Sequence, residues 1–415
     1  MVFSMGFIGY LKKEFSFLKG NYLVLIVSWI LMHFADPIAY IYHSLFVLEL
    51  GATPYILGLI NSLSTLSFAL VQFIGGYIAD YYGRRKIIVL MTFGLAFSNL
   101  FFVFAENWLH ILFGSIFGNI FLVYSPALSA ITADSIPPEK RGLGFSLSHM
   151  IVIVSVFSPL IASFLVVNYG IVYGVKLAYL IVFIFYIISA IIRTRLKETL
   201  PTVRGSIGSY NIFKVYVNAV YESFSALKFA SRDVIKFLLI TVVLDFSMRL
   251  SMPFFVVYAK NVIGLSEGQW AILMTLYYLS SSVSGIFIGK IIDVFGRKNP
   301  LILACFLQTI TLIIFIHGSY TTLIPLFILW ALFDLLMMTS RDAMNADLIP
   351  RNLRGRLSSV RLFFEYVAMS LGYLIGGYLY EHISPQYPFI LNIVFAFVCA
   401  IALLILIVEP IKREL

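Results

Sequence analysis

The chain is poor in charge, and this scarcity excludes an ordinary water-soluble domain. Charged residues make up 12% of its 415 residues and hydrophobic residues 61%, and the mean hydropathy is strongly positive. Long apolar runs recur along the sequence. Because lipid offers the backbone no hydrogen-bond partners, we expect such runs to be membrane-spanning helices of about 20 residues each.

Cysteine is also scarce, and the sequence contains no catalytic or metal-binding motif to which we can assign an activity. Cys305 and Cys399 both lie inside apolar runs, which favours burial as small hydrophobic side chains over a disulfide framework or a metal site. The sequence has neither a His-Glu-x-x-His motif nor a Gly-x-x-x-x-Gly-Lys-Ser/Thr phosphate loop. We therefore expect no enzyme activity, no catalytic residue, no metal and no cofactor.

Positive charge is unevenly distributed along the chain. The net charge of +9 arises from 29 lysines and arginines against 20 acids, and most basic residues fall at every second connection between apolar runs. Basic loops are retained in the cytoplasm, so we expect a multi-pass plasma-membrane protein with both termini cytoplasmic. The N-terminal stretch lacks the apolar core and cleavage site of a signal sequence. Lipid surrounds such a protein, and no nucleic-acid partner is expected.

The apolar runs predict twelve spans. They are expected at residues 21–48, 54–79, 86–104, 108–133, 144–168, 173–193, 234–261, 268–292, 299–317, 322–340, 357–380 and 387–408. The predicted units are an N-terminal interfacial segment over 1–20, an N-terminal six-helix bundle over 21–193, a cytoplasmic linker over 194–233, a C-terminal six-helix bundle over 234–408 and a tail over 409–415. Within the linker, apolar residues at helical spacing predict an amphipathic helix.

A cluster of glycines, acids and bases occurs twice. The two copies are Gly76-Tyr-Ile-Ala-Asp80-Tyr-Tyr-Gly83-Arg84-Arg85-Lys86 and Gly289-Lys-Ile-Ile-Asp293-Val-Phe-Gly296-Arg297-Lys298. Equivalent positions, such as 80 and 293, are 213 residues apart. The same offset relates a second pair of loops, in which Asp134 and Arg141 correspond to Asp347 and Arg354. Two different loops that share one offset indicate two homologous halves.

The repeated cluster resembles the cytoplasmic loop between helices two and three of the major facilitator superfamily, and its second copy resembles the loop after helix eight. The resemblance covers nearly the whole chain. It implies an all-α polytopic membrane protein whose twelve transmembrane helices form two pseudo-symmetric six-helix bundles around a central cavity. It also implies alternating access to that cavity, and we expect the monomer to be functional. One departure is that the family's basic residue after the aspartate is Tyr81 here and Val294 in the second copy.

The resemblance also implies that these loops form a cytoplasmic gate that latches the halves together while the transporter is open to the outside. Asp80 would then meet the following half near Ser358, and Asp293 would meet the first half near Ser146. Alternatively, the charges only anchor the topology. The predicted gate residues are Gly76, Asp80, Gly83, Arg84, Arg85, Gly289, Asp293, Gly296, Arg297 and Lys298.

Ionisable residues inside spans are costly in hydrocarbon and are therefore candidates for function. In the first span His33, Asp36, Tyr40 and His43 share one helix face. The seventh span carries Asp245 and Arg249, and Arg249 is the repeat equivalent of Asp36. We expect the two carboxylates to compete for this guanidinium, so that whichever is left unpaired can take up a proton and couple transport to proton movement. The alternative is a static network, or a capped kink at Asp36.

Other polar residues in the spans form two further sets. Candidates for secondary gating or ion pairing are Asp134, Arg141, Asp334, Asp347, Arg354, Arg361 and Glu365. Candidates for substrate contact are Asn119, Tyr124, His149, Tyr277, Tyr278 and Trp330. Packing is the more usual role of an aromatic or amide in a transmembrane helix.

We therefore expect a secondary active transporter of a small organic molecule, coupled to protons, with efflux of a drug or metabolite preferred. Two departures weaken the efflux and coupling assignments: Gly114 stands where many proton-coupled members carry arginine, and only Ser158-Pro159 remains of the Gly-Pro pattern of drug antiporters. One alternative is proton-coupled uptake of a sugar or organic acid, with Arg249 binding the carboxylate. An alternative of another class is a receptor or scaffold that has the transporter fold but does not translocate.

Overall fold

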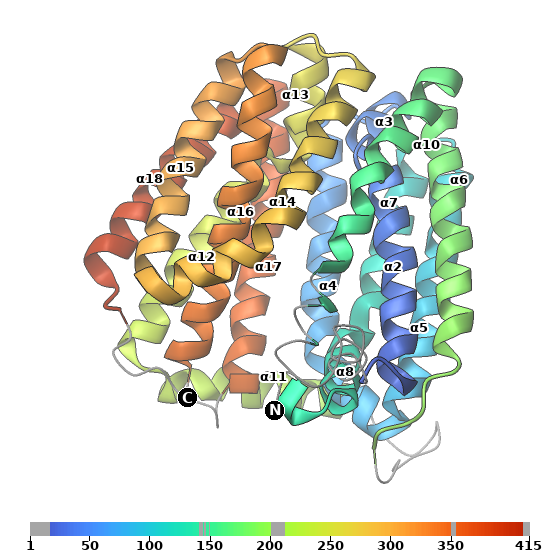
Figure 1. The fold of residues 1–415 in the computed structure, drawn as a ribbon, viewed down its shortest axis with the longest axis vertical. Coiled ribbons are helices and arrows are strands. Elements are labelled where there is room, and N and C mark those ends of the chain that lie inside the picture. The colour runs from blue at the N-terminus through green and yellow to red at the C-terminus, as the bar shows by residue number, and fades with distance from the viewer. Residues whose placement is uncertain are drawn as a thin grey trace, which may run out of the picture.

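The computed structural model describes residues 17–140, 144, 147–148, 150–200, 212–349 and 354–409, and within these residues every regular element is helical. Figure 1 shows the helices of the N-terminal half, coloured blue to green, on one side and those of the C-terminal half, coloured yellow to red, on the other. We call the end where α2 and α17 begin the terminal face and the opposite end the distal face. Most of the predicted segments 1–20 and 409–415 lies outside the described residues.

The N-terminal half contains α2 (Gly20–Tyr40), α3 (His43–Glu49), α4 (Pro54–Tyr82), α5 (Arg84–Ser98), α6 (Leu100–Val103), α7 (Trp108–Phe121), η1 (Leu122–Tyr124), α8 (Ser125–Ser135), η2 (Pro138–Lys140), η3 (Ile151–Phe157) and α10 (Ser158–Arg193). The linker and C-terminal half contain α11 (Ile212–Ser225), η4 (Ala226–Phe229), α12 (Arg232–Ser251), η5 (Met252–Phe254), α13 (Phe255–Asn261), α14 (Glu267–Phe295), α15 (Lys298–His317), α16 (Tyr320–Leu348), α17 (Arg354–His382) and α18 (Tyr387–Leu406).

Nine helices of the described chain are long and apolar enough to cross a membrane, and the bent helix α14 would be a tenth. Several of the twelve predicted spans differ from the observed elements, as at Gly170 and at Pro253. Residues 151–193 form one helical stretch that is broken at Gly170, whose φ of 77° no other residue type adopts readily. The span predicted at 234–261 is divided by the short turn η5, which contains Pro253.

Helix boundaries follow local sequence signals. The Thr53 hydroxyl accepts a hydrogen bond from the Ile56 N–H at 3.3 Å, and Pro54 occupies the first turn of α4. The repeat-equivalent glycines Gly83 and Gly296 end α4 and α14 with φ values of 96° and 84°. This left-handed conformation lets the chain turn directly into the next helix.

The largest shared cluster of buried apolar residues among those described lies toward the distal face. One cluster contains buried residues of both halves, among them Phe46 and Tyr179 from the first and Phe254 and Phe389 from the second. Toward the terminal face each half has its own cluster instead, around Ile88 in the first half and around Leu301 in the second.

Direct contacts between the halves reinforce this distal closure. The Tyr42 hydroxyl donates to the Glu267 carbonyl oxygen at 2.5 Å, and the Glu381 carboxylate accepts from the Tyr55 N–H at 2.7 Å. Gly58 of α4 lies so close to α17 that a Cβ would be 2.4 Å from the Tyr373 carbonyl oxygen. Backbone contact of this kind requires glycine, because any side chain would separate the helices.

Helix α11 lies at the terminal face and packs against both α4 and α17. The ring of Phe224 lies 6.2 Å from that of Phe73 in α4 and 5.7 Å from that of Phe363 in α17. The Glu222 carboxylate is 3.3 Å from the Arg356 guanidinium. The linker helix therefore contacts one helix of each half.

Candidate functional site

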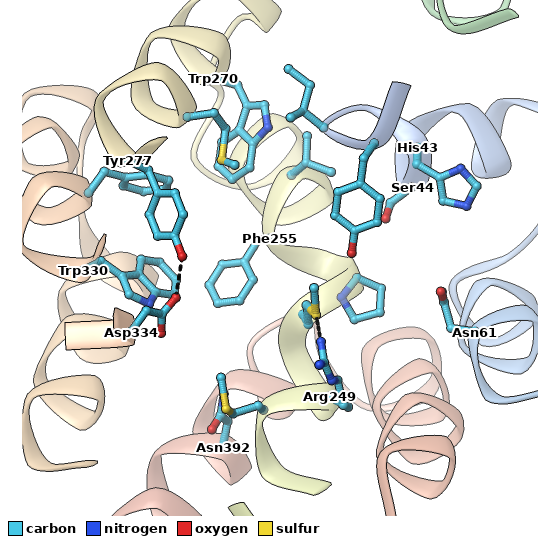
Figure 2. A pocket seen from close by; sticks show the side chains of 18 of the residues that line it. His43, Ser44, Asn61, Arg249, Phe255, Trp270, Tyr277, Trp330, Asp334 and Asn392 are labelled. Atoms are coloured by element: carbon cyan, nitrogen blue, oxygen red, sulfur yellow. Dashed lines mark hydrogen bonds between the residues drawn. The ribbon is translucent and has the colours of Figure 1, made fainter. Parts of the chain in front are cut away.

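A cavity of about 310 Å³ lies between the halves. Helices α2, α3 and α4 supply part of its wall, and the remainder comes from the C-terminal half. Figure 2 shows its ring of aromatic and polar side chains. The predicted residues that line it are Tyr40, His43, Arg249, Tyr277, Tyr278, Trp330 and Asp334.

Aromatic side chains form one wall of the cavity. The ring of Phe255 lies 4.7 Å from that of Trp330 in a T-shaped arrangement, and Trp330 in turn lies 5.5 Å from Phe327. Trp270 of α14 also lines the cavity. Rings packed edge to face hold one another in fixed orientations, so this wall presents a rigid apolar surface to a ligand.

The acid in the cavity wall is Asp334 of α16. The Tyr277 hydroxyl donates a hydrogen bond to its carboxylate at 2.7 Å, and Figure 2 shows Trp330 beside the same group. Asp334 was expected to belong to a secondary gate or an ion pair, but its hydrogen-bond partner here is a tyrosine of the cavity wall. The polar bond holds the carboxylate in place without neutralising it.

The base in the cavity wall is Arg249 of α12. Its Nη1 contacts the Met252 sulfur, and its guanidinium lies 5.8 Å from the centre of the Tyr373 ring. Its Nε is buried and has no hydrogen-bond partner. Among the described residues, no carboxylate lies within ion-pair distance of it.

The expected competition between Asp36 and Asp245 for Arg249 is wrong in this structure. Asp245 is buried and pairs instead with Arg341 of α16 at 2.8 Å. Spacing along α12 places Asp245 near Arg249, but it does not show that α16 brings a second arginine, Arg341, to the same carboxylate. Arg361 and Glu365, predicted as a local pair on α17, do form one, with both carboxylate oxygens within 2.9 Å of Nη1.

Asp36 has a hydroxyl partner instead of a basic one. The Tyr186 hydroxyl of α10 donates to its carboxylate at 2.7 Å, and within the described residues no basic group is close enough to form an ion pair with it. Asp36 lies one helical turn from Tyr40, which lines the cavity and is 56% exposed. His43 hydrogen-bonds through Nδ1 to the Tyr179 hydroxyl at 2.6 Å, whereas His33 and Asp36 are not among the described residues of the cavity wall.

Arg193 is a buried charge at the last residue of the predicted span 173–193, and it was not predicted as a functional residue. It is 0% exposed and hydrogen-bonds to the hydroxyls of Thr92 at 2.8 Å, Ser28 at 3.1 Å and Tyr124 at 3.3 Å. Tyr186 and Arg193 are two helical turns apart on one face of α10, a spacing that could have indicated their shared orientation.

The remaining predicted substrate contacts lie elsewhere. The Asn119 amide donates to the Ser115 carbonyl oxygen of its own helix at 3.0 Å, and Tyr124 is buried beside Arg193. His149 lies outside the described residues. The analysis of the sequence missed three cavity amides, Asn61, Gln308 and Asn392, although polar side chains in apolar spans are a usable signal.

The two repeated loops form equivalent ion pairs at the terminal face. Arg84 lies 2.6 Å from Asp134, and the equivalent residues Arg297 and Asp347 lie 3.0 Å apart. Each half therefore joins its two repeated loops through the same arginine–aspartate pair.

Two glutamates that the sequence analysis did not single out cap these loops. The Glu198 carboxylate accepts from the Arg85 N–H at 3.0 Å, and Glu409 accepts from the N–H groups of Arg297 and Lys298 at 2.7 and 2.8 Å. A carboxylate at the first turn of a helix satisfies unpaired N–H groups and interacts favourably with the helix dipole.

Three ion pairs of the predicted gate residues, Asp80 with Arg84, Arg84 with Asp134 and Arg297 with Asp347, each lie within one half. The Asp80 side chain is 65% exposed and lies 3.6 Å from Arg84 of its own half. Gly76 and Gly289 were expected to permit close approach, but a Cβ at either position would meet nothing within 4 Å. These contacts belong to a state in which the halves share an apolar cluster toward the distal face. Arg141, Ser146 and the Arg354 side chain lie outside the described residues.

One Gly-x-Ser-x-Gly pattern occurs, at residues 264–268, and its serine has a structural role. The Ser266 hydroxyl accepts from the Gln269 N–H at 3.2 Å, and the Gln269 side chain accepts from the Ser266 N–H at 3.0 Å. This reciprocal pair is a capping box at the start of α14.

Comparison with known proteins agrees with this architecture. The model of the Major Facilitator Superfamily matches residues 16–231 and 237–415. The multi-drug resistance efflux pump PmrA of Streptococcus pneumoniae serotype 4 is 23% identical over 326 residues, which cover 77% of this chain and 78% of the pump.

Two solved structures show the same fold. The nucleoside transporter NupG is similar with a TM-score of 0.74 at 11% identity, over 93% of this chain and 99% of that one. A bacterial homologue of the human lysosomal transporter Spinster, in an inward-facing conformation, has a TM-score of 0.70 at 15% identity, over 92% and 95% of the two chains. Matched along nearly its whole length, the chain belongs to the major facilitator superfamily and is a multi-pass membrane transporter.

Proposed function

We propose that this transporter exports small organic molecules from the cytoplasm in exchange for protons. The observation that carries the proposal is the aromatic cavity between the halves, one helical turn from Asp36, a carboxylate whose hydrogen-bond partner is a tyrosine instead of a base. The resemblance to a multi-drug efflux pump over most of both chains supports the direction and the type of cargo.

Asp36 is the proton carrier in this proposal. A half-buried carboxylate without a basic partner is costly when ionised in a medium of low dielectric constant, so the surroundings favour proton uptake. Tyr186 donates to the carboxylate and stabilises the ionised form, which allows the proton to leave again. Asp245 is not the carrier, because Arg341 compensates its charge.

Alternating access follows from how the halves are joined. The shared apolar cluster and the Tyr42–Glu267 hydrogen bond close the distal side, so in this state we infer that the cavity loads from the terminal side. We assign that side to the cytoplasm because the basic repeated loops lie there. In the opposite state the loops around Asp80 and Asp293 would latch the halves together.

The test is accumulation of ethidium by inverted membrane vesicles whose interior is acidified. Wild-type protein should concentrate the dye and lose this ability when a protonophore is added. Asp36→Asn should abolish gradient-driven accumulation while dye equilibration persists. Glu49→Gln, which changes an exposed acid outside the cavity, is the matched control. Full accumulation by Asp36→Asn would reject the proton role, and its absence in wild type would reject export of this dye.

A second candidate is uptake of an organic acid, favoured by the Arg249 guanidinium, which lines the cavity and has no carboxylate partner among the described residues. Proton-coupled uptake would load the cavity from the distal side. Right-side-out vesicles with an acidic exterior would then accumulate a carboxylic acid that does not cross lipid unaided, such as gluconate, in preference to ethidium, and Arg249→Met would abolish that accumulation.

A further inference from the structure

The charged side chains of α12, α16 and α17 divide into those that are neutralised and those that are not. Asp245 pairs with Arg341, and Glu365 pairs with Arg361. Arg249 and Asp334 belong to neither pair, and both line the cavity. The protein thus presents one positive and one negative group to the same space.

Arg249 offers unused hydrogen-bonding capacity. Its observed contacts are a thioether sulfur and the face of an aromatic ring, and neither accepts strongly from a guanidinium. Its donors form a planar fork that matches a carboxylate. An anionic ligand group would gain a charge-assisted pair and would displace only weak contacts.

Asp334 offers the complementary group. One of its oxygens accepts from Tyr277, and an ionised carboxylate has further lone pairs for a second donor. Aromatic faces beside it, including Trp330, would stabilise a cation by their quadrupole. A protonated amine is therefore the favoured occupant of this end.

The space between these ends is apolar. Figure 2 shows Arg249 and Asp334 on opposite sides of Phe255, and the Phe255 ring is fixed by its T-shaped contact with Trp330. A cavity of about 310 Å³ is at the lower end of the range for ligand pockets, which bury most of a drug-sized molecule. A planar hydrocarbon body would fit along this wall.

We propose that the cavity selects amphoteric aromatic molecules, whose anionic group binds Arg249 and whose protonated amine binds Asp334 across Phe255. This substrate class rests on the proposed function in treating the cavity as the transport site. Selection has a repulsive component as well. A simple cation such as ethidium should bind more weakly than an amphoteric molecule but still be transported, because Arg249 remains uncompensated beside it, and a simple anion should bind more weakly because of Asp334.

The proposal is tested by binding to purified full-length protein in detergent, measured by thermal stabilisation and by titration. The probes are a benzene ring bearing an aminomethyl group and, para to it, a carboxylate, and its two relatives that carry only the amine or only the acid. The amphoteric compound should bind at least about tenfold more tightly than either relative, the difference expected from one good charge pair.

Two variants test the contributions of Arg249 and Asp334 separately. Arg249→Met should remove the preference for the amphoteric compound over the amine, and Asp334→Asn should remove its preference over the acid. Glu49→Gln should change neither. Equal binding of the three probes to wild type, a result that needs no variant to fold, would overturn the proposal. So would variants that weaken all three probes equally.

The proposal about the ligand class and the proposal about proton-coupled export can be rejected independently of each other. If the wild type shows the amphoteric preference but no vesicle accumulates substrate, proton-coupled export fails and the ligand class stands. If ethidium accumulates but the amphoteric preference is absent, only the ligand class is wrong. Asp36→Asn should keep the binding preference, because this residue lies outside the described cavity wall.

Discussion

The N-terminal half buries Arg193 among hydroxyl groups, whereas the C-terminal half pairs Arg341 and Arg361 with carboxylates. A guanidinium surrounded by hydroxyls keeps its full charge, and it shares the half with Asp36, whose partner is also a hydroxyl. Paired charges in the C-terminal half cancel locally. Among the described residues, the first half therefore keeps an acid with a hydroxyl partner, whereas the second half pairs Asp245 and Glu365 with arginines and leaves Arg249 and Asp334 to face the cavity.

The largest stability effect should come from breaking a pair in the C-terminal half. Arg341→Met leaves the Asp245 carboxylate buried and uncompensated, which should lower the free energy of unfolding by about 3–5 kcal/mol. The double variant Arg341→Met/Asp245→Asn should recover most of this loss. Thermal unfolding of the single and double variants in detergent measures the coupling, and additive losses would show that the two side chains do not depend on each other.

Breaking the equivalent ion pairs at the terminal face should lower the free energy of unfolding by smaller amounts, which differ between the two halves. Arg297 and Asp347 are each 15% exposed, whereas Asp134 is 46% exposed and its partner Arg84 also has Asp80 within 3.6 Å. Asp347→Asn should therefore cost about 1–3 kcal/mol, and Asp134→Asn less than about 1 kcal/mol. A larger loss for Asp134→Asn in the same unfolding measurement would contradict this order.

The smallest effect should follow removal of the unpaired base in the N-terminal half. Arg193→Met leaves no opposite charge behind, and the hydroxyls of Ser28 and Thr92 still donate to backbone carbonyl groups. The free energy of unfolding should change by less than about 1 kcal/mol, because replacing buried charge with apolar volume is often neutral. A loss as large as that of Arg341→Met would remove the distinction between the halves.

Features that repeat along the chain could be predicted from sequence. A constant offset relates Arg84 to Arg297 and Asp134 to Asp347, and the structure brings each arginine to its aspartate. Adjacent loops of one bundle end meet whenever the helices between them are antiparallel and of similar length. The Arg361–Glu365 pair was equally predictable, because residues four apart on a helix are neighbours.

Partners on different helices could not be predicted in this way. Spacing shows that Asp245 and Arg249 share a face of α12, but not that α16 inserts Arg341 beside Asp245 and leaves Arg249 to the cavity. The burial of Arg193 could not be predicted for a related reason. A base at the end of an apolar run is normally exposed, and the hydroxyl partners of Arg193 come from three other segments.

The sequence by itself determined the membrane-embedded, two-fold repeated architecture, because hydropathy and a constant offset between the repeated loops are properties of the linear chain. The tertiary structure decided which charges cancel and which remain to face the cavity. That outcome depends on distances of a few ångströms between helices far apart in the sequence, and an ion pair exists only where packing brings its two members within such a distance.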